Sequence, residues 1–205
     1  MKPYAIYSKL RERWVGFHTW MVGKSLGSYG GKGRIESPAL INLPDRVFVG
    51  RNAVLCAGIM LACIKNETDP GGSAGEIRIG NSVIIRENVQ ITSAAKVEIG
   101  DGTAIGRSSL ISDHDHGYED IDKNIIDNPI TSTLPVVIED GCLLGCCVRV
   151  APGVRIGRHT MVGFGSVVTK DLPPYSVAIG SPARVVRRYN SETGQWEACR
   201  PERGN

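Results

Sequence analysis

Hydrophobic positions recur every six residues in the last third of the chain. In groups of six from residue 138, the first position is always aliphatic: Ile138, Leu144, Val150, Ile156, Val162 and Val168. A period of six matches neither the 3.6-residue period of a helix nor the two-residue period of a strand. It predicts short strands joined by turns, coiled around a triangular prism with the aliphatic side chains inside. We therefore predict an all-β solenoid whose coils pair as parallel strands about 4.8 Å apart.

A second pattern, aliphatic-x-aliphatic-Gly, marks coils further upstream. It occurs at 47–50, 77–80, 97–100 and 154–157, and with Glu in place of Gly at 136–139. The inward residues at 49, 79, 99, 138 and 156 are therefore 30, 20, 39 and 18 residues apart. Three groups of six make 18, so the excess predicts outward insertions at about 65–76 and 115–135. The expected domains are 1–30 (amphipathic helix and glycine-rich linker), 31–189 (solenoid) and 190–205 (C-terminal hairpin and tail).

The two ends of the chain predict elements outside this repeat. Residues 3 to about 26 predict a helix with one apolar stripe, formed by Tyr7, Leu10, Trp14, Phe17 and Met21. The stripe either covers the open strand edges of the solenoid or a neighbouring subunit, or lies on anionic lipid with Trp14 and Trp20 among the headgroups. Near the other end, residues 185–189 and Trp196 predict a short hairpin around a turn at 192–194.

Composition narrows the class of protein. The net charge is +3 and no dense basic stripe is present, which argues against nucleic acid as a partner. The N-terminus lacks a cleavable signal, and no apolar run reaches the length of a membrane span. We therefore expect a cytoplasmic protein whose six cysteines are reduced thiols rather than disulfides or metal ligands.

The candidate chemistry lies where the repeat meets the long insertion. His114 and His116 occur there among acidic residues, of which Asp113 and Asp115 are nearest. A histidine whose tautomer is fixed by a carboxylate is suited to act as a general base near neutral pH. The residues alone leave open a solvated polar corner without a catalytic role. His18 and His159 fall in regular elements, and we expect structural roles for them.

Several segments resemble a known family. The six-residue repeats, the SDHDHG segment at 112–117 and the closing VGFGSVVTKDLPPYSVAIGSPARVVRR are similar to the hexapeptide-repeat acyltransferases. Within that family, the chain is most similar to the sugar O-acetyltransferases, including the maltose and galactoside enzymes and relatives in polysaccharide biosynthesis. The resemblance extends from about Val47 to Arg188. It implies a left-handed parallel β-helix, a homotrimer with active sites between subunits, acetyl-CoA as the acyl donor, and no metal.

The resemblance also implies roles for individual residues. His116 would be the general base, with His114, two positions earlier, as the alternative; Asp113, His114 and Asp115 would support the base. Arg86, with Asn88 nearby, stands where the maltose and galactoside enzymes offer an Asn to the acceptor, and Leu143 where they place a Trp against the cofactor. The remaining implied cofactor-binding residues are Cys146, Gly163, Phe164, Gly165, Thr169, Lys170, Arg184 and Arg187.

The expected function is transfer of an acetyl group from acetyl-CoA to a saccharide hydroxyl, in cell-surface polysaccharide biosynthesis. Three alternatives remain: N-acetylation of a nucleotide-linked amino sugar, a non-catalytic scaffold, and a γ-type carbonic anhydrase. The last requires three histidine ligands, for which His159 would have to join His114 and His116. Contact with the inner face of a membrane through the first helix also stays open.

Overall fold

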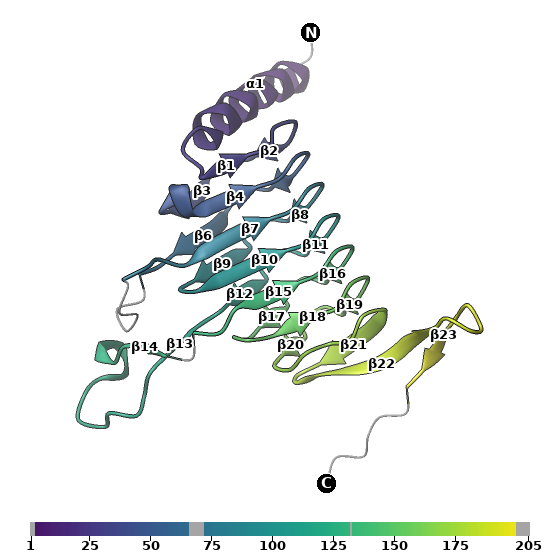
Figure 1. The fold of residues 1–205 in the computed structure, drawn as a ribbon. Coiled ribbons are helices and arrows are strands. Elements are labelled where there is room, and N and C mark those ends of the chain that lie inside the picture. Colours follow the sequence, from purple (N-terminus) through teal and green to yellow (C-terminus); the bar gives the residue numbers. More distant parts are fainter. Residues whose placement is uncertain (1–2, 66–71, 132, 200–205) are drawn as a thin grey trace.

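Three parallel β-sheets carry most of the chain in the computed structural model, which describes residues 3–65, 72–131 and 133–199 (Figure 1). Consecutive strands enter the first, second and third sheets in turn, and the next strand returns to the first sheet. The chain therefore winds in coils stacked along one axis. This arrangement fits a β-helix, as the six-residue repeat predicts.

The strands of each sheet come from successive coils. The first sheet contains β1 (Ser28–Tyr29), β4 (Val47–Val49), β7 (Glu76–Ile79), β10 (Lys96–Ile99), β15 (Val136–Ile138) and β18 (Arg155–Ile156). The second sheet contains β2 (Arg34–Ile35), β5 (Val54–Leu55), β8 (Ile84–Ile85), β11 (Ala104–Ile105), β16 (Leu143–Leu144) and β19 (Met161–Val162). The third sheet contains β3 (Ala39–Asn42), β6 (Ile59–Cys63), β9 (Gln90–Ser93), β12 (Leu110–Ser112), β17 (Arg149–Val150) and β20 (Val167–Val168).

The repeated aliphatic residues form the core, as predicted. Their side chains are at most 3% exposed at all six positions from Ile138 to Val168. Along the first sheet the structure aligns Val49, Ile79, Ile99, Ile138 and Ile156 as direct neighbours. This register confirms the alignment of coils that the aliphatic-x-aliphatic-Gly pattern predicts. Each fully buried side chain of this kind stabilises the fold by about 1.5–3 kcal/mol, and their close stacking explains the fixed register.

The helix α1 (Pro3–Gly23) covers the first coil with polar side chains. The Nδ1 atom of His18 lies 3.0 Å from the carbonyl oxygen of Ile35, and the Ile35 N–H donates to Thr19 Oγ1 at 2.9 Å. These backbone groups of β2 face the open end of the solenoid, where no earlier coil is present to pair with them. Covering that end therefore requires hydrogen-bonding partners. His18 has the structural role expected for it.

The predicted apolar stripe of α1 does not make this contact. Tyr7, Leu10, Trp14, Phe17 and Met21 are all between 45% and 62% exposed. The helix therefore packs on the open end of the solenoid as expected, but through His18, Thr19 and Val22 and not through the predicted stripe, because the strand edge presents unpaired backbone groups. Among the described residues, no helix is both long and apolar enough to cross a membrane.

The other end is covered by antiparallel strands. After the last coil, β21 (Ser176–Gly180) pairs with β22 (Ala183–Asn190), and β22 pairs with β23 (Gln195–Ala198). The predicted hairpin is present, with Tyr189 opposite Trp196. It already begins at Ala183, and at the other end β1 falls within the expected linker. Residues 66–71 of the short insertion and the tail from Arg200 lie outside the described residues.

Candidate active site

The long insertion leaves the solenoid after β12 and forms a small hairpin of its own. β13 (Asp115–His116) pairs antiparallel with β14 (Ile130–Thr131), and the 3-10 helix η2 (Ile125–Asp127) lies in the loop between them. A second 3-10 helix, η1 (Pro44–Arg46), precedes β4. Figure 1 shows the hairpin and its loop projecting away from the stacked coils. The predicted catalytic residues therefore stand at the root of a hydrogen-bonded projection.

Asp113 is the most constrained residue of this root. Its side chain is fully buried and accepts hydrogen bonds from Ser93 Oγ (2.7 Å) and from the backbone N–H groups of Ala94 (2.8 Å) and Ala95 (2.9 Å). Burial acts to raise the pKa of Asp113, but hydrogen bonds from His114, Ala94, Ser93 and Ala95 outweigh it and leave the pKa lowered. A buried carboxylate with this many donors remains ionised at neutral pH.

His114 is held by that carboxylate. Its Nδ1 atom lies 2.9 Å from Asp113 Oδ1, and only 10% of its side chain is exposed. An ionised carboxylate at this distance favours the tautomer with the proton on Nδ1, which leaves Nε2 as a proton acceptor. The Ser112 hydroxyl donates to the carbonyl of His114 at 2.8 Å and fixes the backbone there. The sequence named both residues as possible support for His116, and His114 also as the alternative base, but it did not predict this contact between them.

His116 is presented differently. It is exposed on β13, opposite Ile130, and its ring makes no hydrogen bond or ion pair within the described part of the chain. Its neighbour Asp115 is exposed as well. The structure therefore separates the two histidines: His114 is oriented and largely occluded, while His116 is accessible from solvent.

The predicted acceptor residues lie at a different edge of the prism. Arg86 and Asn88 occupy the turn between β8 and β9, where the chain passes from the second sheet to the third. Arg86 forms an ion pair with Glu87 (3.2 Å), and Asn88 has a φ of 58° beside Gly58. His116 follows the third sheet instead. Within one chain, the width of the third sheet therefore separates it from both acceptor candidates.

Several predicted cofactor residues share the edge with Arg86 and Asn88. Cys146 lies between β16 and β17, and residues 163–165 lie between β19 and β20. The N–H of Gly165 donates to the carbonyl of Cys146 at 2.8 Å, which joins the two turns. A Cβ at Gly163 would come within 2.6 Å of Ile179, so coil packing alone already requires glycine there. Phe164 is 85% exposed and free to contact a ligand.

The remaining cofactor candidates lie towards the C-terminal end. Leu143 and Arg187 line a shallow depression of about 430 Å³ on the second sheet, together with Met161 and Trp196. Thr169 and Lys170 follow β20, and Arg184 lies on β22. Lys170, Arg184 and Arg187 are exposed and form no ion pair with any described residue. Arg184 Nη1 donates to the carbonyl of Ala183 at 2.9 Å. Three cations without an ion-pair partner among the described residues fit the negative charge of a phosphate group.

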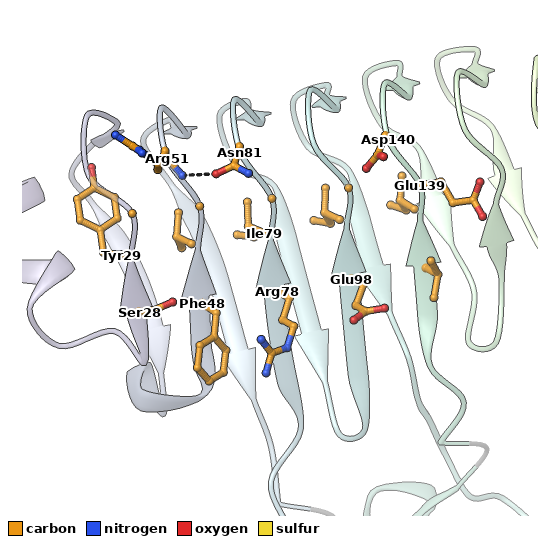
Figure 2. Close-up of a pocket in the computed structure, with 18 of the residues that line it drawn as sticks. Ser28, Tyr29, Phe48, Arg51, Arg78, Ile79, Asn81, Glu98, Glu139 and Asp140 are labelled. Carbon is orange, nitrogen blue, oxygen red and sulfur yellow. Dashed lines mark hydrogen bonds between the residues drawn. The ribbon is translucent and has the colours of Figure 1, made fainter.

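A further groove, of about 930 Å³, contains none of these predicted residues. It runs along the outside of the first sheet, past Phe48, Arg78, Glu98 and Glu139, as Figure 2 shows. The Arg78 guanidinium lies 4.4 Å from the centre of the Phe48 ring. The aliphatic-x-aliphatic-Gly pattern contained a signal for this groove. Its second position points outward and forms part of the lining, and its glycine has no side chain to fill the groove.

Polar groups beside the groove mainly connect the coils. Asn81 Oδ1 accepts the N–H of Arg51 (2.9 Å), and Asp101 Oδ1 accepts the N–H of Asn81 (2.7 Å). Asp140 Oδ1 accepts the N–H of Asp101 in turn, at 2.9 Å. Figure 2 shows the first of these bonds as a dashed line. Since these side chains satisfy backbone donors of neighbouring coils, the groove has a structural explanation that needs no ligand.

Comparison with known proteins agrees with the repeat. Residues 135–170 match the family model described as bacterial transferase hexapeptide (six repeats). The lipopolysaccharide biosynthesis O-acetyl transferase WbbJ of Escherichia coli K12, itself described as putative, is 37% identical over 169 residues, covering 80% of this chain and 82% of WbbJ. The galactoside O-acetyltransferase of the same organism is 34% identical over 114 residues; the match covers 56% of this chain and about half (55%) of that enzyme.

Solved structures share the fold. AntD, an N-acyltransferase from Bacillus cereus solved with dTDP and 3-hydroxybutyryl-CoA, superposes with a TM-score of 0.70 at 17% identity. The match covers 86% of this chain and 90% of AntD. Because the WbbJ match extends over most of both chains, and the repeat, the coil register and the family model agree, this chain belongs to the hexapeptide-repeat acyltransferase family.

Proposed function

We propose that this acyltransferase moves an acetyl group from acetyl-CoA to a hydroxyl of a saccharide in the biosynthesis of a cell-surface polysaccharide. The observation that carries the proposal is the similarity to WbbJ over four-fifths of both chains. The three exposed cations Lys170, Arg184 and Arg187, which form no ion pair with a described residue, support a CoA donor, because its phosphates need such partners. Acetyl-CoA is available in the cytoplasm, where we place the reaction.

We assign the general base to His116. It is accessible at the root of the hairpin, where a sugar hydroxyl can approach it. The hydroxyl oxygen attacks the thioester carbonyl while His116 takes its proton; the C–S bond then breaks, and the proton is returned to the departing CoA sulfur. A positioned base of this kind contributes about 10²–10⁴-fold to the rate. Asp113 and His114 hold the backbone from which β13 starts, and Asp115 lies directly beside the base.

We further propose a homotrimer with active sites between subunits. His116 and the acceptor candidates Arg86 and Asn88 lie at different edges of the prism, so one chain does not gather them. If the edge that carries Arg86 and Cys146 in one subunit packs near the hairpin root of the next, base, acceptor and donor residues meet in one cleft. Sedimentation velocity of the purified protein tests this: a monomeric protein with full activity would contradict it.

The reaction is tested by CoA thiol release with a panel of saccharide acceptors. We expect acceptor-dependent turnover that collapses in His116→Ala, with a smaller loss in His114→Ala. A collapse only in His114→Ala would move the base to the Asp113–His114 pair. Unchanged rates in both variants would contradict a catalytic role for the hairpin root.

An amine acceptor is the second candidate, because the same base can deprotonate an ammonium group on an amino sugar. Product stability separates the two reactions. Mild alkali cleaves an acetyl ester but leaves an acetamide intact, so loss of the acetyl group from the isolated product supports O-acetylation. Retention of the group would favour the N-acetyl alternative.

A further inference from the structure

The outward side of α1 carries an unusually large exposed apolar surface. Eight large apolar side chains are between 44% and 79% exposed on this helix: Tyr4, Ile6, Tyr7, Leu10, Trp14, Phe17, Trp20 and Met21. We call these eight residues the aromatic face. Neighbouring rings lie about 6 Å apart, at 6.1 Å for Trp14–Phe17 and 6.0 Å for Phe17–Trp20. The surface is therefore continuous, and continuous apolar patches of this kind mark interaction sites.

Hydrogen bonds hold the aromatic face outward. On the opposite side of α1, His18 and Thr19 bond to the backbone of Ile35, and Arg11 forms an ion pair with Glu36 at 3.6 Å. Rotating the helix to bury the aromatic face would remove these partners from Ile35. The folded chain therefore cannot cover this surface with its own first coil, and another apolar phase has to do so.

The charges around the aromatic face are mainly positive. At 100° per residue, Arg13 falls within its arc and Lys9 lies at its border, and Lys24 directly follows the end of the helix at Gly23. The Lys24 Nζ lies 4.3 Å from the centre of the Trp20 ring. Glu12, the only acidic residue of α1, lines a small pocket with Glu36 at the edge of the aromatic face, where Tyr4 and Tyr7 line the same pocket.

We propose that the aromatic face binds the surface of an anionic lipid bilayer. Trp and Tyr rings flanked by Lys and Arg match the headgroup region of such a membrane, where rings lie at the interface and cations meet lipid phosphates. A second copy of the chain fits less well, because its aromatic face carries the same cations Lys9 and Arg13, whereas an anionic bilayer supplies the opposite charge. Figure 1 shows α1 at the end of the stack, so a flat surface can approach it without meeting the later coils. The proposal rests on α1 alone and is independent of the proposed reaction.

Vesicle sedimentation tests the proposal with the full chain. Vesicles of phosphatidylcholine with phosphatidylglycerol should carry the protein into the pellet, and vesicles of phosphatidylcholine alone should carry much less. Trp14→Ser combined with Phe17→Ser should weaken partitioning by at least about tenfold, since it removes two large rings from the apolar surface. Trp196→Ser is the matched control at the other end of the molecule, and it should bind as the wild type does.

A second variant isolates the charge. Lys9→Gln combined with Arg13→Gln should lower binding to the anionic vesicles and leave the weak binding to neutral vesicles unchanged. Because these residues are exposed, the helical circular dichroism signal of each variant should match the wild type.

Two results would overturn the proposal. One is wild-type protein that stays in the supernatant with anionic vesicles. The other is a Trp14→Ser, Phe17→Ser variant whose oligomer dissociates in sedimentation velocity without lipid, which would assign the aromatic face to a second copy of the chain.

Discussion

The stacked coils and the β13–β14 hairpin differ in how they place their side chains. In the coils, each inward aliphatic residue lies beside its counterpart one coil away, so identical contacts repeat along the axis. In the hairpin, Asp115 and His116 are exposed, and the strands are joined by two residue pairs and by the N–H of Gly117, which donates to the carbonyl of Pro129. The coils therefore stabilise the fold, while the hairpin exposes side chains that do not contribute to the stability of the fold. Substitutions should separate these two roles.

The largest expected effect is on activity and comes from the hairpin. His116→Ala should lower kcat by about 10²–10⁴-fold, because the proton of the acceptor then has no positioned base. Since His116 is exposed and makes no described hydrogen bond, the free energy of unfolding should change by less than about 0.5 kcal/mol. Steady-state thiol release and urea unfolding of the same preparation check both statements. A large loss of stability would mean that the hairpin holds the coils together.

The next effect is on stability and comes from the coils. Ile85→Ala removes a fully buried side chain of β8 and should cost about 2–5 kcal/mol. The adjacent Ile84→Ala is the matched control, because Ile84 is 41% exposed on the outside of the same strand. It should cost less than about 1 kcal/mol in urea unfolding. Equal costs for the two variants would contradict the inward and outward assignment of the strand.

Asp113 joins the two regions, and its substitution should affect both. Asp113→Asn puts an amide group among the donors of Ser93, Ala94 and Ala95, and should cost about 2–4 kcal/mol of stability. The pKa of Asp113 is lowered in the folded state, so its stabilising effect is complete above the unfolded pKa of about 3.9 and disappears as pH falls through the folded value.

Urea unfolding of wild type and Asp113→Asn at several pH values measures this. The difference in stability should be constant from pH 7 down to about pH 4 and shrink below that. A difference that already shrinks near pH 6 would mean that another group is responsible for the effect.

The smallest expected effect is on the reactivity of the cysteine thiols, which depends on whether each thiol is buried in the coils or exposed. Burial raises the pKa of Cys63 to about 11 and also raises the pKa of Cys142. Cys146 and Cys147 are exposed on a turn. Iodoacetamide should therefore modify Cys146 and Cys147 in the native protein and reach Cys63 and Cys142 only after unfolding. Peptide mass spectrometry with and without urea measures this order, and early modification of Cys63 would contradict the packing of β6.

Much of the fold was predictable because its contacts repeat. Spacing alone aligned Val49 with Ile79 and Ile99, since each coil must place an aliphatic residue over the previous one. The orientation of α1 was not predictable, because an apolar stripe identifies a face but not its partner. The partner of the inward side was the backbone of Ile35, and no side-chain pattern encodes an unpaired backbone group.

The candidate site shows the same division. The six-residue repeat and its interruption located the histidines, but not the burial of Asp113. A signal was present in the alternation of buried and outward residues along β12. Continued one residue past the end of the strand, the alternation places Asp113 inside. The same alternation places Ser93, the last residue of β9, inside. In the proposed homotrimer, the edges of the prism that meet would be set by contacts between subunits, and the repeat in a single sequence does not indicate such contacts.

The spacing of 18 residues between Ile138 and Ile156 has a consequence for the history of such chains. Because one coil touches only the coil before and the coil after it, duplicating or deleting one whole coil leaves every remaining neighbour in place. We therefore expect chains of this fold to change length by gene segments of 54 nucleotides, each of which encodes one coil of 18 residues. Insertions of other sizes survive only as outward loops, and the one between β12 and β15 starts beside two of the four histidines, His114 and His116.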